Sequence, residues 1–226
     1  MQRAKQTSES IELAVFLTLS GGLMDAYSYL GRGGVFANAQ TGNMLLLGVN
    51  LAAGDLGRAA HYAVPVIFFA VGIAAAHSVK ILCRTRRLHW RQLVLVAEVA
   101  TLMAVACMPQ EWNLLANSLT SLACGMQVQS FRKLHGHGFA TTMCIGNLRS
   151  GTQELVSWFH TRDRDRLEAA ALYFGVIVCF VLGAVLGSRL LPVLAERTIL
   201  VSSGLLVVAF AILFQDRERR EGRGTA

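Results

Sequence analysis

Six apolar runs, each close to the length needed to cross a lipid bilayer as a helix, recur along the whole chain. The hydrocarbon core of a bilayer is about 30 Å thick and requires about 20 mainly apolar residues per spanning helix. The runs cover residues 11–30, 62–83, 93–108, 114–131, 168–188 and 199–214. No remaining stretch is long and polar enough to fold as a separate soluble domain. The sequence therefore predicts an all-α integral membrane protein with a single membrane domain over residues 1–226.

The composition agrees with a membrane protein, because 54% of the residues are hydrophobic and only 15% are charged. The net charge of +7 comes from Lys and Arg residues between the apolar runs and near the C-terminus, not from one basic face, so nucleic acid is not an expected partner. The five cysteines show no Cys-x-x-Cys spacing and fall mostly inside apolar runs. We expect free thiols and neither a metal site nor another cofactor.

Two further segments, residues 35–53 and 139–159, are apolar but contain several polar side chains. These side chains are mainly amides and hydroxyls: Asn38, Gln40, Thr41, Asn43, Asn50, Thr141, Thr142 and Asn147. Polar groups exposed to lipid are costly, so we expect protein to shield both segments.

The distribution of basic residues predicts how these two segments run. If both crossed the bilayer, a strongly basic loop or tail would lie outside whichever way the chain was oriented. If each enters and leaves on one face, then sixteen of the 21 Lys and Arg residues are cytoplasmic, four are outside, and Arg149 lies within the second segment. We therefore expect six transmembrane helices and two re-entrant half-helix segments in the cell inner membrane. The tails, residues 1–10 and 215–226, are then cytoplasmic.

The two halves of the chain also resemble each other at an offset of 104 residues. Gly21 aligns with Gly125 and Asp25 with Gln129, and the pairs Gly42-Asn43 and Gly146-Asn147 coincide. Each half, about residues 11–108 and 114–214, contains three spans, so the copies are predicted to form a 3+3 inverted repeat. Such repeats with broken helices are a common plan of transporters. Here the two Gly-Asn pairs are the expected re-entrant turns, and each turn places a helix N-terminus near the midplane.

The motifs at these positions resemble a known family. They are Gly22-x-x-Asp25-Ala26-x-Ser28, Val35-Phe36-x-Asn38, Thr41-Gly42-Asn43 and, in the second half, Met126-Gln127. Together they look like the YoaK family of bacterial multi-pass membrane proteins, a domain of unknown function, over essentially the whole chain. The resemblance implies an inner-membrane protein and supplies no activity. Similar proteins usually repeat Thr-Gly in the second half, where this chain has Ile145-Gly146.

Asp25 is the leading functional candidate, because a carboxylate in the outer third of a span is expensive unless it faces protein or water. It could bind a cation or relay a proton. As a structural group, it could instead cap the first half-helix or pair with an arginine. Glu98 in the third run could join a relay, or could lie at the cytoplasmic interface beside Arg91.

The remaining candidates lie at the expected turns and in the fourth run. They are Asn38, Thr41, Gly42, Asn43, Gln127, Gln129, Thr142, Gly146 and Asn147. The turn residues could line a solute or ion pathway, or could only satisfy the backbone of two buried turns. For the two glutamines, hydrogen bonding between helices is the favoured interpretation.

Two classes of function remain open. The first is a small-solute or ion transporter or channel with a polar site between the two re-entrant turns. The alternative is a non-transporting membrane subunit or scaffold that binds a partner protein through small-residue patterns such as Gly183-x-x-x-Gly187 and Gly72-x-x-x-Ala76. No recognisable catalytic pairing is present, so we do not expect an enzyme. The lipid bilayer and an unidentified solute or ion are the expected partners, and homo-oligomer formation stays open.

Overall fold

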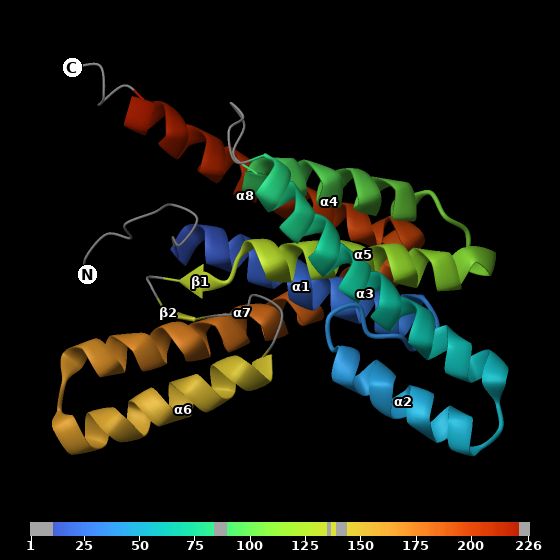
Figure 1. Cartoon of the computed structure of the whole chain (residues 1–226), viewed down its shortest axis with the longest axis horizontal. Helices are drawn as coiled ribbons and strands as arrows, with labels where there is room; N and C mark the ends of the chain where they lie inside the picture. The colour runs from blue at the N-terminus through green and yellow to red at the C-terminus, as the bar shows by residue number, and fades with distance from the viewer. Residues whose placement is uncertain (1–10, 84–89, 135–136, 139–143, 222–226) are drawn as a thin grey trace.

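The computed structural model describes residues 11–83, 90–134, 137–138 and 144–221, and this part of the chain is almost entirely helical (Figure 1). The helices are α1 (Ile11–Gly31), α2 (Gln40–Ala52), α3 (Leu56–Leu82), α4 (Trp90–Ala106), α5 (Asn113–Ser130), α6 (Cys144–Thr161), α7 (Arg164–Leu194) and α8 (Ile199–Glu221). Short 3-10 turns, η2 (Gln110–Trp112) and η3 (Ala195–Thr198), precede α5 and α8. Two-residue strands, β1 (Lys133–Leu134) and β2 (His137–Gly138), pair antiparallel. The all-α prediction is confirmed for the described residues.

Three helical stretches of the described chain are long and apolar enough to cross a membrane. They are α1, α3 and the stretch Arg164–Phe214, which contains α7, η3 and most of α8. Large apolar side chains on their outer surfaces, such as Ile67, Val181 and Val207, are about half exposed, at 58%, 53% and 51%. An exposed apolar surface of this kind suits a lipid environment. The fold is therefore that of a membrane protein.

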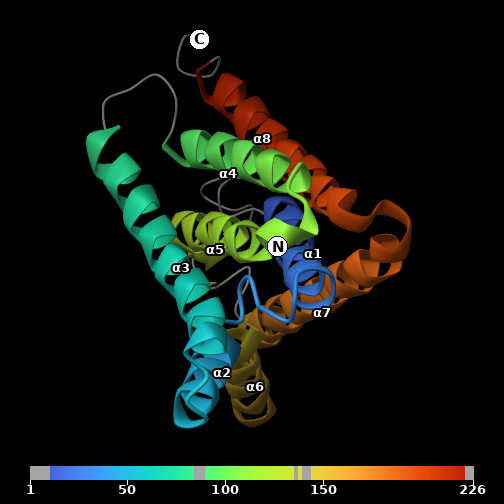
Figure 2. The ribbon, with the colours of Figure 1, turned by 90° about the vertical axis from the view of Figure 1, so that its right-hand side faces the viewer.

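The helices pack in a pattern that repeats between the two halves of the chain. Figure 2 shows α1 and α5 in the middle, with α3, α4, α8 and α7 around them. Helix α1 packs against α7 and α8, α5 packs against α3 and α4, and α4 packs against α8. The short helices α2 and α6 pack on α3 and α7. Exchanging α1 with α5, α2 with α6, α3 with α7 and α4 with α8 reproduces these main contacts, although the smaller contact between α3 and α4 has no counterpart of similar extent between α7 and α8.

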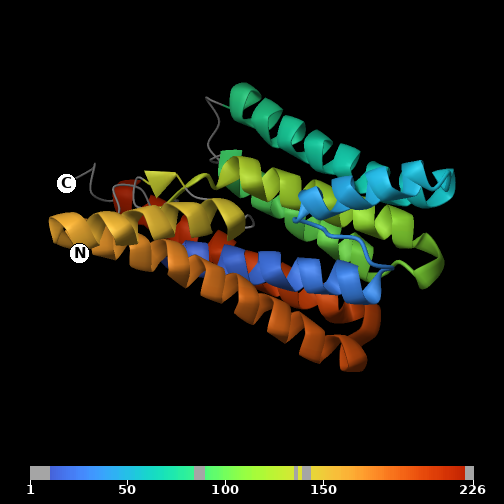
Figure 3. The same ribbon diagram turned by 90° about the horizontal axis from the view of Figure 1, so that it is seen from below.

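The short helices run in opposite directions along the molecule. Both α2 and α6 begin near the middle of the long axis and run to opposite ends, as Figures 1 and 3 both show. With 13 residues, α2 is about 20 Å long at 1.5 Å per residue. Helix α1 begins and α8 ends at the same end of the long axis, where α6 also ends.

Glycines bring the backbones of the central helices into direct contact. A Cβ atom on Gly22 would overlap the carbonyl oxygen of Phe180 in α7, and one on Gly183 would overlap that of Leu19 in α1. Gly125 and Gly72 make the equivalent contacts between α5 and α3, against the carbonyls of Phe69 and Leu122. The small-residue patterns therefore pack inside the molecule. Gly22 and Gly125 occupy equivalent places in this packing. The offset between them is one residue shorter than the offset of 104 residues in the sequence alignment.

The predicted turn at Gly42-Asn43 is wrong, because both residues lie in the first turn of α2. The irregular chain comes earlier, and Gln40 N donates to the Asn38 carbonyl at 2.8 Å where the helix begins. Gly42 has no side chain and so admits the ring of Phe36 against the helix. Gly146 and Asn147 likewise lie inside α6, not at a turn. Thr142, another candidate, lies outside the described residues.

Candidate functional site

Asp25 binds the start of the first short helix. Its Oδ1 accepts a hydrogen bond from the Asn38 amide at 2.7 Å, and the amides of Ala37 and Ala39 also interact with this carboxylate. Ala39, the N-cap residue of α2, supplies no capping side chain. The buried Asp25 carboxylate thus provides both the hydrogen-bond acceptor and the negative charge that favour a helix N-terminus. This geometry matches the capping alternative.

The amide side chains before and within α2 satisfy the irregular backbone that leads into it. Asn43 accepts from the Phe36 amide at 3.0 Å and donates to the Phe36 carbonyl at 2.7 Å, as a neighbouring strand would. Asn38 Nδ2 donates to the Gly21 carbonyl of α1 at 2.9 Å. Gln40 Nε2 donates to the Ala37 carbonyl at 2.7 Å and to Ser121 Oγ of α5 at 3.3 Å. The segment is therefore fixed between α1 and α5.

The other candidates of the two short helices divide by exposure. Thr41 is exposed and Gly42 is partly buried. Gly146 is exposed, and no atom lies within 4 Å of the place that a Cβ would occupy there. Asn147 is buried at 2% exposure and lies in the first turn of α6, as Asn43 does in α2. Of these residues, only the two asparagines belong to the interior.

The two glutamines of α5 form hydrogen bonds between helices. Gln127 Nε2 donates to the Leu17 carbonyl of α1 at 3.0 Å. Gln129 Nε2 lies 3.1 Å from His77 Nδ1 on α3. These contacts agree with the favoured interpretation of both residues.

Glu98 is completely enclosed on α4. Its exposure is 0%, and neither carboxylate oxygen has a hydrogen-bond partner among the described residues. Arg91 forms no hydrogen bond with these oxygens, and its Nε donates to the Ser130 carbonyl at 2.9 Å, at the end of α5. Glu98 is therefore an interior residue of the protein.

Hydroxyl and amide side chains line much of the interior around these carboxylates. The buried ones include Thr18, Ser20, Ser28, Asn117, Ser118, Thr120, Ser121, Ser202 and Ser203. The hydroxyls of Ser20 and Ser202 bond to each other across α1 and α8. The Thr18, Ser28 and Ser203 hydroxyls have no hydrogen-bond partner among the described residues. The interior thus contains many polar groups beside its apolar core, and their hydrogen-bonding capacity is only partly used.

Arg32, which follows α1, is a structural residue that sequence reasoning missed. It is fully buried, and its guanidinium donates to five acceptors: the Tyr27 hydroxyl, the carbonyls of Val105, Met108 and Pro109, and Asn113 Oδ1. Three of these acceptors are carbonyls at the end of α4 or just after it. The negative end of the helix dipole lies there, so a cation at this place is stabilising. An arginine followed by two glycines directly after a span was the only sequence signal.

A hydrogen-bonded chain continues from Arg32 to the second half. Asn113 Nδ2 donates to Gln110 Oε1 at 2.9 Å, and Gln110 Nε2 donates to Glu196 Oε1 at 2.7 Å. The bond from Gln110, together with the Glu196 backbone amide and the positive charge of Arg32, lowers the pKa of Glu196. This chain joins α1, the α4–α5 connection and η3 at one end of the bundle.

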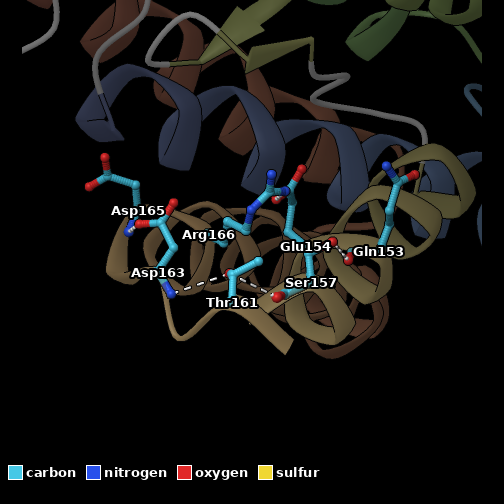
Figure 4. Close-up of polar contacts among 7 residues, drawn as sticks. All are labelled: Gln153, Glu154, Ser157, Thr161, Asp163, Asp165 and Arg166. Carbon is cyan, nitrogen blue, oxygen red and sulfur yellow. Dashed lines mark hydrogen bonds and ion pairs between the residues drawn. The ribbon is translucent and has the colours of Figure 1, made fainter. Parts of the chain in front are cut away.

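The hairpin between α6 and α7 has its own polar contacts (Figure 4). Arg166 Nη1 and Glu154 Oε2 form an ion pair of 3.1 Å, and Asp163 caps α7 by accepting from the Asp165 amide at 3.0 Å. Asp55 caps α3 in the corresponding hairpin of the first half. An open depression of about 590 Å³ lies on α6, beside Ile145, Leu148, Arg149 and Val156.

The comparisons place the chain among proteins without an assigned activity. The family model described as "Protein of unknown function (DUF1275)" matches residues 13–212. This match covers most of the chain and confirms the family resemblance seen in the motifs. No curated protein matches the chain, and no solved structure does.

Proposed function

The chain belongs to the DUF1275 family of proteins of unknown function, and we propose that it is a transporter or channel for a small solute or ion in the inner membrane. In this proposal six helices span the bilayer, α2 and α6 are re-entrant half-helices, and both termini are cytoplasmic. The buried polar groups of α1, α4, α5 and α8 line the pathway. No relative supplies this function, so the proposal depends on the packing and polarity of the chain itself.

The exchangeable packing of the two halves supports a 3+3 inverted repeat. Each helix of one half has a counterpart with the same main packing partners in the other half, and α2 and α6 run to opposite ends. The distribution of basic residues independently favours opposite orientations for the two halves. Inverted repeats whose broken helices meet near the midplane give transporters a site that opens to either side.

The observation that carries the proposal is the set of buried polar groups without partners. A buried hydroxyl or amide that lacks a hydrogen bond costs about 1–3 kcal/mol, and lipid offers no water to relieve it. Thr18, Ser28, Ser203 and both oxygens of Glu98 are in this position among the described residues. A protein that admits water or a polar solute to this region in another conformation has a reason to retain such groups.

Asp25 has a defined role in a change between these two conformations. Its bond to the Asn38 amide ties α1 to the start of α2. Any movement of the first half-helix relative to α1 breaks this bond and exposes the carboxylate, so Asp25 would act as a gate between the two elements.

A partner-binding subunit is the second candidate, supported by the surface of α6. Ile145 and Val156 are 79% and 50% exposed there and lie beside the open depression. The conspicuous glycine patterns do not add to this surface, because Gly72 and Gly183 pack inside the molecule. Transport is therefore the better supported of the two.

Accessibility of the interior tests the proposal without a known substrate. In a cysteine-free background, Ser203→Cys and Leu206→Cys place a thiol on the same helix at positions that are 5% and 0% exposed. We expect a small charged methanethiosulfonate to modify Ser203→Cys in membranes and to leave Leu206→Cys unmodified. Equal protection of both thiols would contradict a water-accessible pathway.

Flux is the second measurement. The purified protein is reconstituted in liposomes and screened by solid-supported membrane electrophysiology with Na⁺, K⁺, Cl⁻, amino acids, sugars and organic acids. A current with one class of solute identifies the substrate, while pull-down of one stoichiometric partner together with an absence of currents supports the subunit alternative.

A further inference from the structure

Among the carboxylates in the part of the chain that the structure describes, Glu98 is the most isolated from water and from hydrogen-bond donors. It lies in the middle of α4, and the apolar residues Leu95 and Leu102 occupy the same buried face at 0% exposure. Both of its oxygens lack a partner among the described residues. The first half of the molecule thus holds an acidic group that no structural contact explains.

The elements packed around α4 offer no cation to this carboxylate. Cys124 is the titratable group of α5, and the described side chains of α8, residues 199–214, include none. On α1, Asp25 is engaged by the Asn38 amide. The ionisable groups near α4 on the other elements lie toward its ends. They are His77 and Lys80 on α3, which contact Gln129 and Trp90, Arg32, which donates to the Val105 and Met108 carbonyls, and Glu196 and Arg197 in η3.

An ionised carboxylate cannot persist in this environment. Transfer of an unpaired charge from water to a low-dielectric interior costs many kcal/mol, so the group takes up a proton instead. A bound metal ion is disfavoured, because hard cations take about six oxygen ligands, and here neither Glu98 oxygen has any partner among the described residues. The described residues also contain no group of three or more His, Cys, Asp or Glu that could hold a metal. The ligand that fits a lone enclosed carboxylate is a proton.

We propose that Glu98 is the proton-binding site that couples transport to the proton gradient. The coupling ion is then a proton, provided that the protein is the transporter proposed above. Glu98 carries the proton in the closed conformation and releases it when the surrounding helices separate and water enters.

Infrared difference spectroscopy of the full chain in lipid tests this site. A protonated carboxyl has a C=O stretch that is separate from the amide bands. We expect this band at pH 7 in the wild type and in Glu154→Gln, which removes a part-exposed carboxylate of α6. The band should be absent in Glu98→Gln, whose amide has nearly the same shape as a protonated carboxyl. Glu98→Asp should restore the band and guards against misfolding of the amide variant.

Exchange in D₂O distinguishes a coupling site from a static buried acid. We expect the Glu98 band to shift within minutes of transfer to D₂O, because opening exposes the carboxyl to solvent. An absent band at pH 7, or a band that stays unshifted for hours, would overturn the inference. The reactivity of Ser203→Cys is measured separately. If this thiol is modified but Glu98 is not protonated, only the coupling site is refuted. If the thiol is not modified, the transport function itself is refuted.

Discussion

Arg32 Nη2 donates to the Met108 carbonyl at 2.7 Å, so the residue that follows α1 holds the end of α4. Because the guanidinium also reaches the Tyr27 hydroxyl and Asn113 Oδ1, Arg32→Ala should lower the free energy of unfolding by about 3 kcal/mol or more. Arg32→Lys should recover little of this, since an ammonium group cannot span the same acceptors. Arg58→Ala, at a side chain 77% exposed, is the control and should melt like the wild type in detergent. Equal melting of all three variants would show that Arg32 is not structural.

Asp25→Ala should destabilise the protein more than Asp25→Asn. The alanine leaves the buried Asn38 amide without an acceptor, at about 1–3 kcal/mol, whereas an asparagine carbonyl still accepts from it. Thermal melting of both variants measures this difference. If Asp25→Asn kept full stability and lost all flux, the charge itself would belong to the transport step and not only to the cap.

Gly125→Ala should prevent folding or cost at least about 3 kcal/mol, because the new methyl group overlaps the Phe69 carbonyl oxygen and forces α5 away from α3. Gly204→Ala is the matched control on α8, where no atom lies within 4 Å of the added methyl group. It should be neutral or stabilising by about 1 kcal/mol through helix propensity. Yield and melting temperature after purification separate the two outcomes.

Stability should fall in acid through Glu196. The bond from Gln110 lowers the pKa of Glu196 below its ordinary value of 4.5. A lowered carboxylate pKa contributes stability above the unfolded-state pKa, and this contribution is lost as the pH falls through the folded-state pKa. Glu196→Gln removes that contribution. The melting temperatures of wild type and variant should therefore differ at pH 7 and converge below pH 4.5. A constant difference at all pH values would exclude Glu196 as the source.

The proposed re-entry of α2 and α6 from opposite faces predicts that the ends of these helices are accessible from opposite sides of the membrane. In a cysteine-free background, Ala53→Cys follows α2 and Thr161→Cys ends α6, and both positions are exposed. An impermeant thiol reagent on intact cells should label Ala53→Cys, and should reach Thr161→Cys only after the membrane is opened. Labelling of both positions in intact cells would rule out the inverted arrangement.

The helices were largely predictable because apolar runs of spanning length leave few alternatives. Errors of several residues occurred where polar signals set the ends. Helix α3 begins at Leu56, six residues before the predicted run, because Asp55 caps it. Helix α7 extends from Arg164 to Leu194, beyond the predicted residues 168–188, with Asp163 as its cap. Hydropathy alone does not detect such caps.

The site was predictable in its residues but less so in its contacts. Asp25, Asn38, Asn43 and Glu98 are all buried, as their cost in a membrane implies. Their partners depend on which elements meet in space. Thus the Asp25–Asn38 bond, the enclosure of Glu98 and the five acceptors of Arg32 could not be read from one sequence.

The glycine contacts have a consequence for synthesis of the chain. Gly22 finds its partner, the Phe180 carbonyl, only in the other half of the molecule. At about 5–20 residues per second, the ribosome adds the intervening residues in roughly 8–32 seconds. During that interval α1 waits in the membrane with its contact surface uncovered. Neither half can complete its packing alone, because these contacts join α1 to α7 and α5 to α3. The last step of folding is therefore the packing of the two halves against each other.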